Sequence, residues 1–186
     1  MSIICHGIIL EARTHLILHI KNSRTRNIGP PPKTWFPMAF FDGVAASSTR
    51  RARAFLLLND QHYFSVTLGC GPSTNTRYEL LALWSLLSFA KDMGLPYLNV
   101  FGDSSMIIKW VNGESSLNMV NLEAWCYNTK MLLSSFTHVE FRHVYREYNK
   151  RVDTLSKVGL KEVAGYLTLS EICEGEAMEE VRLQLF

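Results

Sequence analysis

The longest helix predicted from this sequence opens with residues 74–83, which read TNTRYELLAL. Leucine and alanine recur up to Met93, and Gly94 and Pro96 follow, so we expect a helix from Asn75 to Met93 that ends at a glycine. Thr76 and Glu79 stand three residues apart, which is the spacing of a capping box at a helix start. Helix capping therefore explains Glu79 without a catalytic role, and a catalytic role remains an alternative explanation.

Short apolar segments on both sides of this helix predict a sheet. The expected strands are residues 38–42, 52–59, 62–68, 97–101 and 137–146, and the expected further helices are 104–112, 122–135 and 149–161. Three early strands followed by alternating helices and strands favour an α/β fold, with a mixed sheet and helices packed over it.

The two ends of the chain differ in composition from this body. Residues 1–34 combine a segment suited to an amphipathic helix with a linker that contains three consecutive prolines. Residues 35–161 form the predicted domain, and residues 162–186 form an acidic carboxy-terminal extension. The apolar alternation at residues 181–186 fits either an added strand or disorder.

Composition excludes several protein classes. An apolar fraction of 47% and a charged fraction of 19% describe a folded globular protein. The apolar runs are far shorter than the ~20 residues of a membrane span, and no signal peptide is recognisable, so we expect no membrane association. Four scattered cysteines favour an intracellular protein, in nucleus or cytoplasm. Residues 1–60 carry eight Lys/Arg and three Asp/Glu, which suits a polyanionic partner or ordinary solvated charge.

Four carboxylates are candidate ligands because each lies where the predicted fold brings a side chain into shared space. They are Asp42, Glu79, Asp103 and Asp153. Acids that converge repel one another unless a cation lies between them, and two divalent ions held ~3.5–4 Å apart are a device for cutting phosphodiesters. The set of four therefore indicates a metal-dependent nuclease.

Taken singly, each acid also has a structural explanation. Asp42 fits a turn at the end of an apolar strand, and Asp103 fits a helix N-cap, as does the following serine. Asp153 lies between two lysines at helical spacing, as in a surface ion pair. No single acid decides between structure and chemistry.

Read together, four pieces of the sequence resemble the type 1 ribonuclease H domain, in the version carried by plant retroelements related to non-LTR retrotransposons. The pieces read FFDG (40–43), TNTRYELLAL (74–83), GDS (102–104) and HVYREYNKRVDTLSK (143–157). They span about residues 35–160, and the second and fourth are the specific ones.

The resemblance implies a ribonuclease H-like fold, with a five-stranded mixed sheet whose first three strands are antiparallel and with helices on its faces. It implies two Mg²⁺ ions, with Mn²⁺ as a possible substitute, that hydrolyse the RNA strand of an RNA–DNA hybrid. The catalytic and metal-binding set is Asp42, Glu79, Asp103 and Asp153. The implied nucleic-acid contacts are Gly43, Thr74, Asn75 and Ser104, although Thr74 and Asn75 are explained equally well as helix-start residues.

The chain departs from that family's pattern in two places. Where the family has several glycines after the first acid, residues 45–54 read AASSTRRARA, which predicts a strained first hairpin or a changed turn type. The loop histidine that precedes the last acid in many members is missing, and His143 fits a packed strand residue, so slow turnover is expected.

These departures define an alternative function and the expected partners. The alternative is a catalytically inactive or weak nucleic-acid-binding remnant of a retroelement polyprotein. The partners that the resemblance implies are an RNA–DNA hybrid, other nucleic acid and the upstream reverse transcriptase segments. We expect the chain to be a monomer.

Overall fold

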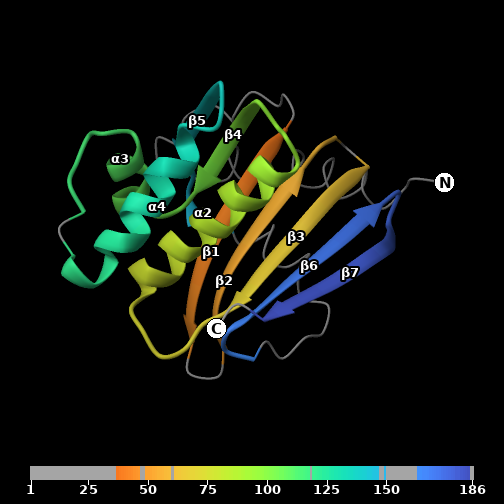
Figure 1. The fold of residues 1–186 in the computed structure, drawn as a ribbon, viewed down its shortest axis with the longest axis horizontal. Helices are drawn as coiled ribbons and strands as arrows, with labels where there is room; N and C mark the ends of the chain where they lie inside the picture. Colours follow the sequence, from red (N-terminus) through yellow and green to blue (C-terminus); the bar gives the residue numbers. More distant parts are fainter. Residues whose placement is uncertain are drawn as a thin grey trace, which may run out of the picture.

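The computed structural model describes residues 37–46, 49–59, 61–117, 119–146, 149 and 163–184. Its strands are β1 (Met38–Ala46), β2 (Thr49–Leu57), β3 (His62–Gly69), β4 (Tyr97–Gly102), β5 (His138–His143), β6 (Tyr166–Cys173) and β7 (Glu176–Gln184). They form one sheet in the order β5-β4-β1-β2-β3-β6-β7 (Figure 1). β1, β4 and β5 run parallel to one another, and the remaining neighbours are antiparallel.

The described helices follow the sheet's central strands in sequence. They are α2 (Asn75–Asp92), α3 (Ser105–Val111), the short 3-10 helix η1 (Val120–Leu122) and α4 (Glu123–Leu133). In Figure 1, α2 lies across β1 and β2, and α4 lies beside α2. The rings of Trp84 and Trp125 meet edge to face at 5.1 Å and join these two helices. No helix in the described part of the chain has the length and apolar composition of a membrane span.

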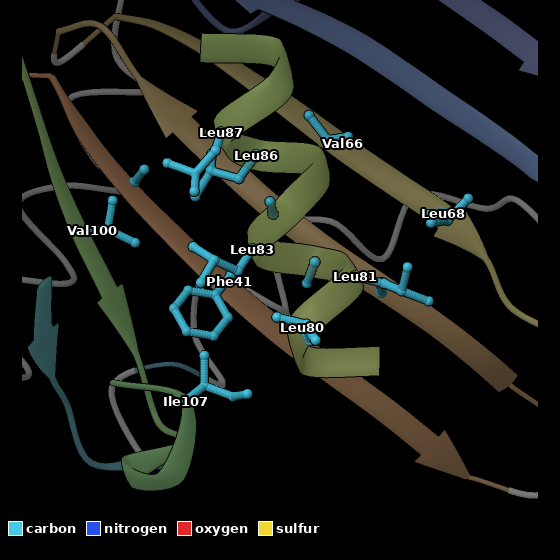
Figure 2. Close-up of a cluster of buried hydrophobic side chains, with 14 of the residues drawn as sticks. Phe41, Val66, Leu68, Leu80, Leu81, Leu83, Leu86, Leu87, Val100 and Ile107 are labelled. Atoms are coloured by element: carbon cyan, nitrogen blue, oxygen red, sulfur yellow. The ribbon is translucent and has the colours of Figure 1, made fainter. Parts of the chain in front are cut away.

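The core lies between α2 and the strands beneath it. Leu80, Leu83 and Leu87 are fully buried, because they repeat at three- and four-residue intervals on the face of α2 that meets the sheet (Figure 2). Phe41 of β1 and Ile107 of α3 join the same cluster. Each buried leucine contributes about 1.5–3 kcal/mol relative to an exposed one, so this face of α2 is anchored firmly.

The prediction of five strands is wrong, because the carboxy-terminal segment adds two more. β6 pairs with the edge of β3, and β7 pairs with β6. Leu167 and Leu169 alternate along β6 and pack against the core. Between the strands, Glu174 and Gly175 both have positive φ, at 52° and 83°, as a two-residue type I′ hairpin turn requires. The strand interpretation of the carboxy-terminal alternation is therefore the one that the structure shows.

The first hairpin is longer and more regular than expected. The predicted strand 38–42 ends too early, and the predicted strand 52–59 starts and ends too late, since β1 and β2 pair residue for residue from Met38 opposite Leu57 to Ala46 opposite Thr49. The arginines of β2 alternate with Ala52 and Ala54, which are buried in the core. This period of two is the strand pattern that the charged composition obscured. The predicted strain or change of turn type concerns the turn at 47–48, which lies outside the described residues, so it stays a prediction.

The antiparallel pairing of the first three strands and the order of the later elements are confirmed. The amino-terminal segment 1–34, almost all of the helix predicted at 149–161 and the acid Asp153 lie outside the described residues.

Candidate active site

Two of the candidate acids stand side by side because of the parallel pairing of β1 and β4. Phe41 of β1 is in register with Gly102 of β4, so the next residues of the two strands are Asp42 and Asp103. The ring of Phe41 lies against Gly102, where a β-carbon would overlap it. β1 continues beyond this point while β4 ends, so Asp42 lies in mid-strand and is not the turn residue that one interpretation of the sequence offered.

The third acid is brought to the same place by a close contact between β1 and the start of α2. A β-carbon on Gly43 would lie 2.5 Å from the backbone nitrogen of Glu79 and 2.8 Å from its Cγ. Gly43, one of the implied nucleic-acid contacts, is buried and lies against α2. The glycine after Asp42 therefore lets Glu79 lie directly against the strand that carries Asp42.

The capping explanation of Glu79 is wrong. The N-cap of α2 is Thr74, whose side chain accepts a hydrogen bond from the backbone nitrogen of Arg77 at 3.3 Å. Thr76 lies inside the helix, and Glu79 lies beyond its first turn. Thr74 is thus a helix-start residue, as one of its two interpretations held, while Glu79 has no capping role.

The segment that leads into α2 is anchored by the residue before Glu79. Tyr78 is 1% exposed, and its hydroxyl donates to the carbonyl oxygen of Gly71 at 3.0 Å. The same hydroxyl accepts from the backbone nitrogen of Ser73 at 2.7 Å. A buried tyrosine satisfied in this way fixes the first turns of the helix, and with them the direction of Glu79.

Two of the predicted nucleic-acid contacts hydrogen-bond to Glu79. The side-chain amide of Asn75 donates to Glu79 Oε1 at 2.6 Å. The hydroxyl of Ser104, which follows Asp103, also bonds the Glu79 carboxylate, and it makes no side-chain cap bond to α3. Asn75 and Thr74 are exposed at the start of α2, whereas Ser104 is partly buried.

Burial raises the pKa of Glu79 from 4.5 to about 7, and it is the largest cause of the shift. The negative charges of Asp103 and Asp42 raise this pKa further, while the Ser104 hydrogen bond and the charge of Arg146 lower it. The three acids from β1, α2 and the end of β4 are therefore close enough to interact. Their mutual repulsion is the electrostatic condition that a bound cation relieves.

Asp103 is held by two residues that the sequence analysis did not place in the site. Asn149 donates from Nδ2 to Asp103 Oδ1 at 3.0 Å. His143 Nε2 lies 3.1 Å from the backbone oxygen of Asp103. His143 is a strand residue as expected, at the end of β5, but it is exposed and not packed in the core. Both residues belong to the fourth piece quoted above, where their positions close to Asp153 were the available clue.

No three acids, histidines or cysteines of the described residues are close enough to form a ligand set for one ion. The fourth predicted acid, Asp153, is not among those residues. What the described part shows is three oxygen-donor side chains gathered at one end of the parallel strands, where open α/β sheets commonly bind ligands.

Comparison with known proteins relates this geometry to one family. The family described as reverse transcriptase-like matches residues 40–159. A curated ribonuclease HI from Halobacterium salinarum is 29% identical over 125 residues, which is 66% of this chain and 63% of that protein. The chain therefore spans less than two thirds of the length of this relative.

Solved structures with the same fold include two ribonucleases. The crystal structure of RNase H1 from Halobacterium salinarum has a TM-score of 0.53 and 25% identity, over 64% of this chain and 92% of that one. LC11-RNase H1, solved in complex with an RNA/DNA hybrid, also has a TM-score of 0.53, with 20% identity over 64% of this chain and 93% of that chain. The second likeness shows the fold alone. β6 and β7 lie beyond the residues that the family matches.

Proposed function

Because this chain belongs to the reverse transcriptase-like family, we propose that it hydrolyses the RNA strand of RNA–DNA hybrids as a type 1 ribonuclease H. The observation that carries the proposal is the convergence of Asp42, Glu79 and Asp103 from three separate elements. Burial raises the pKa of Glu79, and the negative charges of Asp103 and Asp42 raise it further. A ribonuclease HI relative and the fold shared with RNase H1 structures support the same activity.

The donor chemistry of Asp42, Glu79 and Asp103 suits hard divalent cations, while these three described acids do not by themselves form a ligand set for one ion. The donors are carboxylate oxygens, which Mg²⁺ prefers, and Mg²⁺ keeps several of its own waters, so it needs few ligands from the protein. We propose that Asp42, Glu79, Asp103 and Asp153 hold two Mg²⁺ ions, for which Mn²⁺ is a substitute. When bound, such ions lower the pKa of the attacking water and neutralise charge on the phosphate.

The chain's own residues prepare this site in defined ways. Asn75 and Ser104 direct the Glu79 carboxylate by donating hydrogen bonds to it, and Arg146 offsets part of the negative charge. With a pKa of about 7, Glu79 is roughly half protonated at neutral pH in the absence of a cation. It gives up that proton when a cation is bound, which couples site occupancy to pH.

Recognition of the hybrid is proposed for the exposed start of α2. Thr74 and Asn75 are exposed next to Glu79, within reach of a nucleic acid whose phosphate lies at the acids. Protein contacts to 2′-hydroxyls in a wide, shallow minor groove would distinguish the RNA strand from DNA. We also propose upstream reverse transcriptase segments as partners, because the chain belongs to the reverse transcriptase-like family.

The test is cleavage of an RNA–DNA hybrid labelled on its RNA strand, with RNA duplex and DNA duplex as controls. We expect Mg²⁺-dependent cleavage of the hybrid alone, and its loss in Asp103→Asn. The matched control is Asp92→Asn, since Asp92 is an exposed acid at the far end of α2 and should leave cleavage unchanged. Cleavage that survives Asp103→Asn would show that the active site lies elsewhere. Hybrid binding with intact RNA at high Mg²⁺ would select the catalytically silent binding module.

A further inference from the structure

Asn149 connects two of the strands that carry the acids. Its side-chain nitrogen lies 2.9 Å from the backbone oxygen of Phe41 and 3.0 Å from Asp103 Oδ1. Phe41 immediately precedes Asp42 in β1, so a single amide group joins the backbone beside one acid to the carboxylate of another. Asn149 is 2% exposed, so neither bond competes freely with water.

The chemistry of the two partners determines how this amide is used. A backbone carbonyl and a carboxylate oxygen both accept hydrogen bonds, so only the NH₂ group of Asn149 can satisfy them, one hydrogen to each. A hydrogen bond to a carboxylate is stronger and shorter than one between neutral groups, and it restricts rotation of the Asp103 side chain. Asn149 holds the Oδ1 oxygen of Asp103. Because the carboxylate is rigid and planar, fixing Oδ1 also fixes the direction in which Oδ2 points.

We propose that Asn149 is a positioning residue that sets the Asp103 carboxylate for metal binding by tying it to β1 beside Asp42. This inference rests on the proposed function, because it concerns the same acids. The side-chain hydrogen bonds of Asn149 go to the backbone oxygen of Phe41 and to Asp103 Oδ1, so the residue acts on the site through Asp103. Ligating carboxylates are commonly oriented by such hydrogen bonds, and loss of one typically weakens metal affinity or activity about 10–100-fold.

The variant Asn149→Ala removes both side-chain hydrogen bonds. The variant Asn149→Ser keeps one hydrogen-bond donor. The matched control is Asn99→Ala: Asn99 is likewise 2% exposed, and its amide donates to a backbone oxygen, that of Pro37, at 3.3 Å. Asn99 lies within β4, opposite Met38 at the start of β1, whereas Asp103 follows the last residue of β4. The two substitutions therefore remove equal side chains from equally buried positions.

The readouts are the Mg²⁺ dissociation constant from calorimetry on protein without nucleic acid, the melting temperature in chelator, and the Mg²⁺ concentration for half-maximal cleavage. For Asn149→Ala we expect Mg²⁺ to bind about 10-fold more weakly or worse, and the half-maximal concentration to rise in parallel. Asn149→Ser should lie between Asn149→Ala and the wild type. Asn99→Ala should lower the melting temperature and leave Mg²⁺ affinity unchanged.

A folded Asn149→Ala or Asn149→Ser that binds Mg²⁺ like the wild type would overturn the inference while leaving the nuclease assignment intact. Failure of both Asn149 variants to fold, with Asn99→Ala folded, would also overturn it, because the residue would then serve the fold. The wild type could bind Mg²⁺ in a way that depends on Asn149 and still cleave no hybrid. That result would support the positioning role of Asn149 and refute the proposed nuclease activity. A wild-type chain that binds no Mg²⁺ would refute both.

Discussion

Replacing Glu79 by glutamine should stabilise the metal-free protein at neutral and alkaline pH. Glu79 is partly buried next to Asp42 and Asp103, and these surroundings raise its pKa from 4.5 to about 7. Between these two pH values the unfolded chain has released the proton while the folded chain retains it. Stability therefore falls as pH rises from about 4.5 to about 7, because ionisation favours the unfolded state. Glutamine has the same shape, cannot ionise and removes this loss.

The magnitude follows from the two pKa values. The difference of 7 − 4.5 corresponds to about 3 kcal/mol, at ~1.36 kcal/mol for each pH unit. The full gain is expected above pH 8, and almost none below pH 4, where glutamate is protonated in both states. For a chain of this size, a gain of that order raises the melting temperature by roughly 6–12 °C.

The assay is urea denaturation of both proteins in chelator at pH 4, 6 and 8. The matched control is Glu123→Gln, because Glu123 is an exposed glutamate in the first turn of α4. Its loss should cost about 0.3–1 kcal/mol at pH 8, since a negative charge near a helix N-terminus is favourable. A Glu79→Gln protein with no gain at pH 8, or with the same gain at pH 4, would refute the electrostatic reasoning. Added Mg²⁺ should stabilise the wild type more than Glu79→Gln.

Three further outcomes are expected. Gly43→Ala should destabilise the fold by about 1–3 kcal/mol and abolish hybrid cleavage, because its β-carbon would meet the backbone at Glu79, whereas Gly71→Ala, with open space around it, should leave melting and activity unchanged. Mg²⁺ affinity, measured by calorimetry, should rise about tenfold between pH 6 and pH 8 as Glu79 ionises, and a flat profile would contradict its role as a ligand. Removing residues 163–186 should expose the edge of β3 and cause aggregation that light scattering detects; a monodisperse product would contradict the structural role of β6 and β7.

Features that depend on residues close together in the chain were predicted better than features that depend on long-range pairing. The helix that begins at Asn75 was predictable, because leucines at helical spacing and a following glycine are local patterns. The strand count was not, since the polar and acidic composition of residues 162–186 concealed the alternation of Leu167 and Leu169 and the turn at Gly175. The start of β2 was missed as well, because the predicted strand begins at Ala52 whereas β2 begins at Thr49 and pairs with the end of β1.

The candidate site shows the same division. The acids were identified from motifs that resemble a known family, and three of them lie near one another in the described structure. The hydrogen-bond partners of those acids were not identified. Asn75 and Ser104 were predicted only as nucleic-acid contacts, which stays a prediction, and Asn149 had no assigned role. A residue's type states what it can donate or accept, and only its neighbours decide which acceptor it reaches.

By itself, the sequence determined the order of the central elements, the family and the acids worth testing, because each of these depends on residues close together in the chain or on a recognisable motif. The tertiary structure alone decided that β6 and β7 complete the sheet, that Gly43 lies against α2, and that Asn149 joins β1 to Asp103. It alone also decided the raised pKa of Glu79. The physical reason is that burial, repulsion and hydrogen bonding act through space, between segments that only folding brings together.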